Sequence, residues 1–83
     1  MLRVTVYTTA VCPYCVQAKR LLSDRSIPYD EIDIGADEAR RDEMIQRSGG
    51  RLTVPQIFID GAHVGGYTEL RALADAGGLV GVP

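Results

Sequence analysis

Apolar and polar positions follow two different periods in the first half of the chain. Residues 2–7 alternate with period two and are rich in β-branched side chains, which predicts a strand. Residues 16–22 have an apolar face at helical spacing, formed by Val16, Ala18, Leu21 and Leu22. After Pro28, which cannot continue a helix, residues 29–34 alternate again around Tyr29, Ile32 and Ile34. The pattern therefore predicts strand, helix and strand in succession.

The second half continues with a helix, two strands and a helix. Residues 38–47 are predicted to form a helix with a thin apolar stripe of Ala39, Met44 and Ile45. Asp37 is the expected N-cap, and a glycine in the left-handed conformation is expected to end the helix. Residues 52–59 form the most hydrophobic predicted strand, and Asp60-Gly61 predicts a type I′ hairpin to a return strand at 62–64. A last helix is predicted over 68–76, capped near Tyr67 or Thr68, and the tail 79–83 is expected to pack loosely or fray.

This order of elements indicates one α/β domain spanning residues 1–83. Strands joined through helices are expected to run parallel, whereas the last two strands form an antiparallel hairpin. The prediction is a four-stranded mixed sheet with three helices on its two faces, in the order βαβαββα. That architecture is consistent with a thioredoxin-like fold.

Composition narrows the classes of function. The chain has 83 residues, of which 24% are charged, and a net charge of −2, so it lacks the basic surface that nucleic acid or an anionic membrane would require. No apolar run approaches the ~20 residues of a membrane-spanning helix. The N-terminus starts on a predicted strand without a signal-peptide pattern, so we expect a cytoplasmic protein, with no nucleic-acid or membrane partner.

The two cysteines of the chain, Cys12 and Cys15, lie between the first predicted strand and helix. A thiolate is the nucleophile in disulfide exchange, and a helix N-terminus favours a thiolate on Cys12. Pro13 fits the first helical turn, where its missing N–H has no partner to lose. Cys15 lies one turn further on and is expected to be more buried, where it would resolve a mixed disulfide. Zinc half-site and inert core cysteines remain alternatives, although His63, the one histidine, is expected to be an exposed strand residue.

Two later segments have both a structural and a functional interpretation. In Thr53-Val54-Pro55, the proline can simply be the first residue of a strand. Alternatively, a cis peptide before Pro55 would turn the Val54 backbone N–H and C=O outward, where they could pair with the backbone of a disulfide substrate. Gly65-Gly66 and the residues that follow form either a turn with a capped helix or a site for a carboxylate on backbone N–H groups.

Together these segments resemble a dithiol glutaredoxin of the short bacterial type. The resemblance is carried by Tyr7-Thr8, Cys12-Pro13-Tyr14-Cys15, Thr53-Val54-Pro55 and Gly65-Gly66. It implies a cis-proline at Pro55, no tightly bound cofactor or metal, and glutathione as both reductant and bound ligand. By position, Cys12 is the nucleophile and Cys15 the resolving thiol, with Pro13 and Tyr14 completing the active-site motif. The glutathione-binding residues that it implies are Tyr14, Arg41, Thr53, Val54, Pro55, Gly66, Tyr67 and Thr68.

The chain departs from the family pattern at three places. Thr9 stands where a lysine is usual, and Thr68-Glu69 follows where many members have two short polar or acidic residues. The approach to Thr53 is one residue longer, and Arg51 in it can supply positive charge near the site. These departures concern the affinity for glutathione more than the cysteine chemistry.

The resemblance implies a glutathione-dependent oxidoreductase that reduces protein disulfides and protein–glutathione mixed disulfides. One alternative is a glutaredoxin-like electron donor to ribonucleotide reductase that is itself reduced by thioredoxin reductase. Another is a carrier of an iron–sulfur cluster ligated by glutathione and Cys12 of two subunits. The expected partners are glutathione and disulfide-containing or glutathionylated proteins, and the chain is expected to be a monomer.

Overall fold

The computed structural model describes residues 3–79 and contains the predicted succession of elements. The elements are β1 (Val4–Thr8), α1 (Pro13–Asp24), β2 (Tyr29–Asp33), α2 (Glu38–Arg47), β3 (Gln56–Ile59), β4 (Ala62–Gly65) and α3 (Tyr67–Asp75). Within this part of the chain, no helix is long and apolar enough to cross a membrane.

The four strands form one mixed sheet in the order β2-β1-β3-β4. β1 pairs in parallel with β2 and antiparallel with β3, and β3 pairs antiparallel with β4. The parallel pairing of β1 with β2 and the terminal hairpin are as predicted. The expectation of parallel strands is wrong for β3, which follows β2 through α2 but runs antiparallel to β1. Asp60 and Gly61 have φ angles of 52° and 84°, so the hairpin turn has the two positive φ angles of a type I′ turn.

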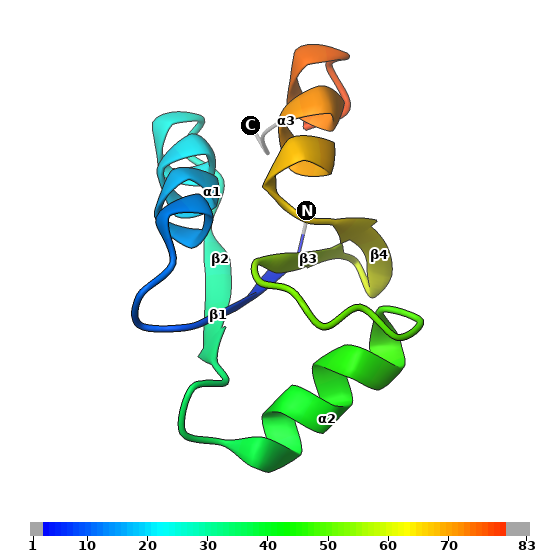
Figure 1. The fold of residues 1–83 in the computed structure, drawn as a ribbon. Coiled ribbons are helices and arrows are strands. Elements are labelled where there is room, and N and C mark those ends of the chain that lie inside the picture. The colour runs from blue at the N-terminus through cyan, green and yellow to red at the C-terminus, as the bar shows by residue number, and fades with distance from the viewer. Residues whose placement is uncertain (1–2, 80–83) are drawn as a thin grey trace.

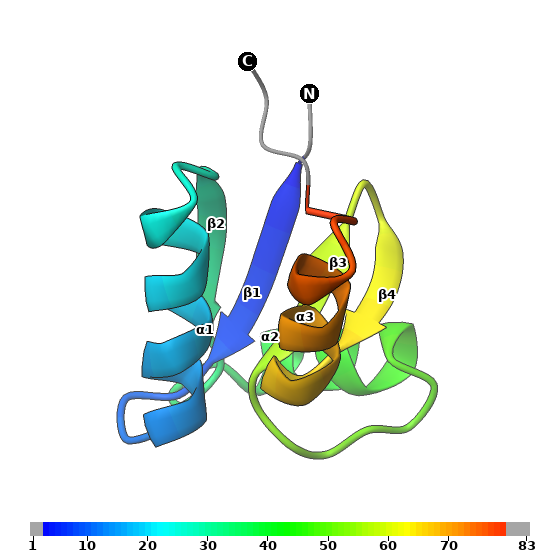
Figure 2. The same cartoon turned by 90° about the horizontal axis from the view of Figure 1, so that it is seen from above.

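Helices cover both faces of the sheet, with α1 and α3 on one face and α2 on the other (Figures 1 and 2). Alternation along β1 divides the core, because Val4 and Val6 face α1 and α3 while Tyr7 faces α2. The larger cluster is formed by Val4, Val6, Ala18, Leu22, Ile27, Ile57, Leu70, Ala74 and Leu79. The smaller cluster is formed by Tyr7, Ile34, Met44 and Phe58.

Helix boundaries confirm two of the predicted caps. The Asp37 side chain accepts a hydrogen bond from the Arg40 N–H at the start of α2. Gly49 has a φ of 75° just after the helix, and the Gly50 N–H donates to the Ile45 carbonyl at 2.8 Å. This is the left-handed glycine stop that the sequence indicates.

Three predictions about strand bounds and helix faces are wrong. β3 begins at Gln56 rather than at residue 52, because the Val54–Pro55 peptide is cis and Pro55 has no N–H for a strand ladder. Val16 is 51% exposed, and Cys15 takes its place on the buried face of α1. Ala39, assigned to the apolar stripe of α2, is exposed.

The two chain ends differ only slightly from expectation. β1 ends at Thr8, one residue later than predicted, and the predicted strand position at residue 2 lies outside the described residues. Leu79, assigned to a loosely packed tail, is only 5% exposed and packs in the larger cluster. The rest of that tail, residues 80–83, lies outside the described residues.

Candidate dithiol site and the adjoining groove

Cys12 and Cys15 are joined by a disulfide at the start of α1. Cys12 is the N-cap residue and Pro13 is the first residue of the helix. The Cys15 backbone N–H donates to Cys12 Sγ at 3.1 Å, so an otherwise unpaired donor of the helix N-terminus already points at this sulfur. When the disulfide is reduced, the same N–H and the helix dipole favour a thiolate on Cys12.

The two sulfurs differ in access. Cys15 is 1% exposed and lies among the buried residues of α1, whereas Cys12 is half-buried. An incoming disulfide therefore meets Cys12 first, and Cys15 is placed to attack Cys12 Sγ once Cys12 is bonded to a substrate sulfur. The pair has the asymmetry of a nucleophile and a resolving thiol, as the spacing indicates.

The segment before β3 forms a wall beside Cys12. The Val54–Pro55 peptide is cis, which the resemblance implies and the sequence alone leaves open. The Val54 carbonyl oxygen lies 3.7 Å from Cys12 Sγ. The wall thus presents peptide backbone next to the sulfur at which exchange would occur.

A groove of about 250 Å³ runs from this wall to the start of α3. Its lining contains seven of the eight residues predicted to bind glutathione, together with Arg51 and Glu69; the seven are Tyr14, Thr53, Val54, Pro55, Gly66, Tyr67 and Thr68. Arg41, the eighth, is an exposed residue of α2 and does not line the groove. The structure therefore brings together all the predicted residues except Arg41.

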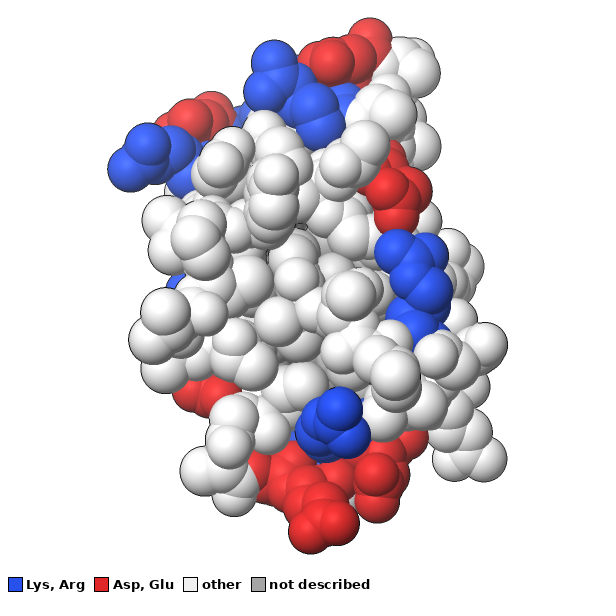
Figure 3. All heavy atoms as spheres, in the orientation of Figure 1, with Lys and Arg blue, Asp and Glu red and all other residues white. Residues whose placement is uncertain are grey.

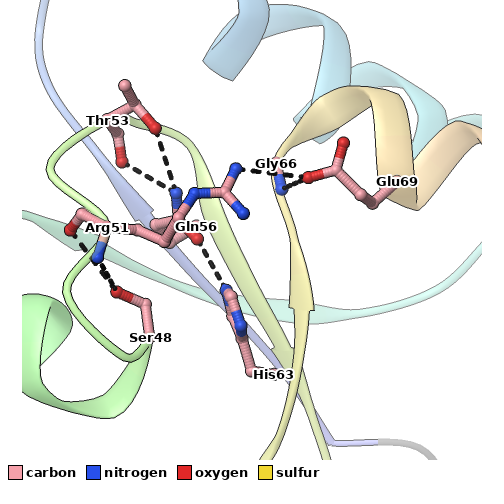
Figure 4. Close-up of polar contacts among 7 residues, drawn as sticks. All are labelled: Ser48, Arg51, Thr53, Gln56, His63, Gly66 and Glu69. Atoms are coloured by element: carbon pink, nitrogen blue, oxygen red, sulfur yellow. Dashed lines mark hydrogen bonds and ion pairs between the residues drawn. The ribbon is translucent and has the colours of Figure 1, made fainter.

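Arg51 and Glu69 face each other across the groove (Figure 4). The guanidinium of Arg51 donates to Glu69 Oε1 at 3.3 Å, and the Gly66 N–H donates to the same oxygen at 2.9 Å. The Gly66 N–H, and to a smaller extent Arg51, hold the pKa of the Glu69 carboxyl below its ordinary value. The Arg51 backbone is itself fixed, since its N–H donates to Ser48 Oγ at 3.1 Å.

The cap of α3 differs from the prediction. Gly66 is the N-cap, so neither Tyr67 nor Thr68 takes that role, and Glu69 at the third helical position satisfies the Gly66 N–H. A glutamate three residues after a cap is the second half of a capping box, which is the sequence signal for this contact. Gly65 has a φ of 127°, and a Cβ there would lie 2.5 Å from Glu69 Oε1. The positive φ and the folded-back Glu69 side chain therefore both favour glycine at this position.

One face of the molecule has few charges, and exposed apolar side chains lie near the dithiol. The face toward the viewer in Figure 3 is uncharged over its centre and has Lys, Arg, Asp and Glu around its rim. The large exposed apolar residues of the described chain include Val11, Tyr14 and Leu52, which lie next to the dithiol or the groove in sequence. The rings of Tyr14 and Tyr67 stack at 6.1 Å and join the starts of α1 and α3. Such a surface is suited to contact with a peptide or protein.

A buried amide lies behind the wall. Gln56 has no exposed surface, and its side-chain amide contacts Thr53 and His63. His63 is exposed on β4, as predicted, but its contact with Gln56 is not evident from sequence. Over residues 3–79, no group of three or more His, Cys, Asp or Glu side chains is placed to hold a metal ion.

Comparisons with known proteins agree on one family. The family model described as Glutaredoxin matches residues 4–64. Glutaredoxin 3 of Escherichia coli strain K12 is 52% identical over 79 residues, which cover 95% of this chain and 94% of that protein. A glutaredoxin of Neisseria meningitidis is 49% identical over 83 residues, covering 99% and 96% of the two chains.

Solved structures give the same result for the fold. The solution structure of glutaredoxin from Brucella melitensis is 49% identical with a TM-score of 0.81, and the match covers 95% of this chain and 85% of that one. A buckwheat glutaredoxin–glutathione complex is 28% identical with a TM-score of 0.83, covering 92% and 71%. These neighbours confirm the predicted thioredoxin-like fold, with its four-stranded mixed sheet and three helices.

Proposed function

The chain belongs to the glutaredoxin family, whose members are thiol–disulfide oxidoreductases, and from that premise we propose that glutathione is its reductant and bound ligand. Its substrates are protein disulfides and protein–glutathione mixed disulfides. Cys12 is the nucleophile and Cys15 the resolving thiol. The observation that carries the proposal is the groove, because it begins at the Val54 carbonyl beside Cys12 and ends at the N-terminus of α3.

For a protein–glutathione mixed disulfide, the Cys12 thiolate attacks the glutathione sulfur. The protein leaves as a thiolate, which takes up a proton, and glutathione is now bonded to Cys12. A second glutathione thiolate attacks the glutathione sulfur of this intermediate. Oxidised glutathione leaves and the Cys12 thiolate is restored, so Cys15 takes no part in this cycle.

For a protein disulfide, both cysteines act. Cys12 attacks one substrate sulfur and releases the other as a thiolate. Cys15 then attacks Cys12 Sγ, which releases the second substrate thiol and leaves the Cys12–Cys15 disulfide. Two glutathione molecules reduce that disulfide and become one molecule of oxidised glutathione. The disulfide between the half-buried Cys12 and the buried Cys15 is the oxidised member of this cycle.

The groove offers a partner for each part of glutathione. The Val54 backbone pairs with the backbone of its cysteine, as in addition of a strand to a sheet edge. The N–H groups of Tyr67 and Thr68, at the positive end of the α3 dipole, hold the γ-glutamyl carboxylate. Arg51 lines the groove and supplies positive charge for a ligand carboxylate, a role that the resemblance gives to Arg41. The related buckwheat glutaredoxin–glutathione complex supports this ligand.

The test is a coupled assay in which NADPH consumption is followed with glutathione, glutathione reductase and a small mixed disulfide of glutathione. Rapid consumption that depends on both glutathione and this protein is expected. A parallel reaction replaces glutathione and its reductase by thioredoxin reductase, with a protein disulfide as substrate. Turnover only in the second reaction would overturn the proposal and favour the ribonucleotide reductase type of electron donor.

A further inference from the structure

We propose that Gln56 is a positioning residue that holds the Thr53–Val54 wall against Cys12, and that His63 fixes the orientation of the Gln56 amide. The inference rests on the proposed function in one respect, namely that the wall pairs with the backbone of the substrate disulfide. Gln56 and His63 do not line the groove. They act on the site through the residues that do.

Gln56 closes a short loop of the chain around the cis peptide. Its Nε2 group donates to the Thr53 carbonyl at 3.0 Å and to Thr53 Oγ1 at 3.2 Å (Figure 4). Both ends of the loop are thus tied together, and the loop contains only Val54 and Pro55 between them. Because Gln56 is fully buried in β3, the anchor of this loop is the sheet itself.

The orientation of the Gln56 amide follows from its partners. A reversed amide would place its oxygen against the Thr53 carbonyl, where two acceptors would face each other. Oε1 must therefore face His63, whose Nε2 lies 2.7 Å away, and that nitrogen must be the donor. The imidazole is fixed in turn by its neighbour on β3, since its ring lies 5.1 Å from that of Phe58. His63 is a donor to Oε1 in its cationic form and in the neutral tautomer with hydrogen on Nε2.

The amide bears on the reaction through the position of Val54. The Val54 carbonyl oxygen lies 3.7 Å from Cys12 Sγ. The Val54 side chain packs against the smaller cluster, and the Gln56 amide holds the backbone of the residue before it. Release of Thr53 by Gln56 would let the loop move away from Cys12, and a substrate backbone would lose its partner.

The experiment measures the KM and kcat of Gln56→Met, which keeps the length of the side chain but can neither donate nor accept these bonds. Dithiothreitol is the reductant and a peptide disulfide is the substrate, so that the assay contains no glutathione. We expect KM to rise about fivefold or more while kcat stays within about twofold, because binding is lost and the cysteine chemistry is kept. His63→Leu should raise KM in the same direction, and His63→Gln, which keeps a donor, should restore it.

Tyr7→Phe is the matched control for a general loss of stability. It removes a buried hydroxyl that donates to Glu43 and accepts from Arg47, on the same face of the sheet but outside the groove. Its KM should equal that of the wild type. Unchanged KM in Gln56→Met and His63→Leu would overturn the inference, as would a KM in Tyr7→Phe that rises equally.

The inference can still be tested if one variant does not fold or if glutathione is not the reductant. His63 is exposed, so His63→Leu tests the inference when Gln56→Met is unstable. A wild type that works with dithiothreitol but not with glutathione contradicts the proposed function alone. Slow hydrogen exchange of the Gln56 side-chain amide, lost in His63→Leu, is a second expected result that does not depend on activity.

Discussion

The Val54 carbonyl oxygen lies 3.7 Å from Cys12 Sγ, although 42 positions separate the two residues in the chain. β1 and β3 are neighbours in the sheet, and each leads to one side of this contact: Cys12 follows β1 and Val54 precedes β3. The antiparallel pairing places the end of one strand beside the start of the other. The sulfur and the peptide wall are therefore brought together by the sheet.

The difference in burial between the two cysteines leads to a prediction for Cys15→Ser. In the proposed cycles, Cys15 acts only on the mixed disulfide that Cys12 forms with a protein disulfide substrate. The variant should therefore keep reduction of a protein–glutathione mixed disulfide and lose reduction of a protein disulfide. The two activities are measured in the same coupled NADPH assay with the two substrates. Cys12→Ser is the matched control and should lose both activities. Loss of both in Cys15→Ser would contradict the two separate cycles.

Local patterns predicted most of the fold and the dithiol. The two periods in the sequence identified the helices and strands because each element buries one face, and Cys12 could be placed at a helix start from Pro13 and the strand before it. Val16 was misplaced because Cys15, taken only as a redox residue, also fills the core position on α1. A single residue thus had a structural and a chemical role.

Contacts between distant segments could not be predicted in this way. The ion pair of Arg51 and Glu69 and the contact of Gln56 with His63 depend on loop and strand geometry that periodicity does not contain. Arg41 was assigned to the ligand by its position in the chain alone. α2 packs on the face of the sheet opposite α1 and α3 (Figure 2). Arg41 is an exposed residue of α2 and is not among the residues that line the groove.

The close approach of Gly65 and Glu69 predicts a large cost for Gly65→Ala. A Cβ would lie 2.5 Å from Glu69 Oε1 at a φ of 127°, so backbone strain and overpacking both act. We expect the free energy of unfolding to fall by about 3 kcal/mol. Gly61→Ala is the control, because φ is also positive there but nothing lies within 4 Å of the added Cβ, and it should cost about 1–2 kcal/mol. Urea denaturation measures both, and equal costs would contradict the steric argument.

Three carboxylates make the fold sensitive to acid. Hydrogen bonds lower the pKa values of three glutamates below the ordinary value of 4.5. The largest contribution comes from Lys19 for Glu31, from the Tyr7 hydroxyl for Glu43 and from the Gly66 N–H for Glu69. A carboxyl whose pKa is lower in the folded state stabilises the fold above its unfolded pKa, and this stabilisation is lost as the pH falls through the folded pKa. The free energy of unfolding should therefore be constant near neutral pH and fall below about pH 4.5.

Urea denaturation between about pH 7 and pH 3 measures this dependence. In Glu43→Gln and Glu69→Gln, the free energy of unfolding should fall less steeply below about pH 4.5, since the substituted group no longer titrates. Asp75→Asn is a control on the exposed face of α3, where the carboxylate pairs with Arg71. Because all of these groups are partly exposed, added salt should reduce the effect. If both glutamine variants lost stability in acid as steeply as the wild type, these carboxylates would not be the cause of the acid sensitivity.

The ion pair of Arg51 and Glu69 leads to a prediction about glutathione affinity. The pair is exposed, so it adds little to stability, but both groups line the groove. We expect Arg51→Gln and Glu69→Gln each to raise the KM for glutathione about fivefold with little change in kcat, because each removes one charge that the zwitterionic ligand would meet. In Glu69→Gln the amide oxygen can still accept from the Gly66 N–H, so the start of α3 is kept.

Arg71→Gln provides the comparison for this last pair of variants. Arg71 forms a similar exposed ion pair on α3, with Asp75 at 3.2 Å, and does not line the groove beside the dithiol. Its KM for glutathione should equal that of the wild type, and high salt should raise the wild-type KM toward those of the two groove variants. A fall in KM in Arg51→Gln would instead mean that the ion pair closes the groove and competes with the ligand. An equal rise in Arg51→Gln and Arg71→Gln, with no rise in Glu69→Gln, would show that net charge, and not the groove, determines the affinity.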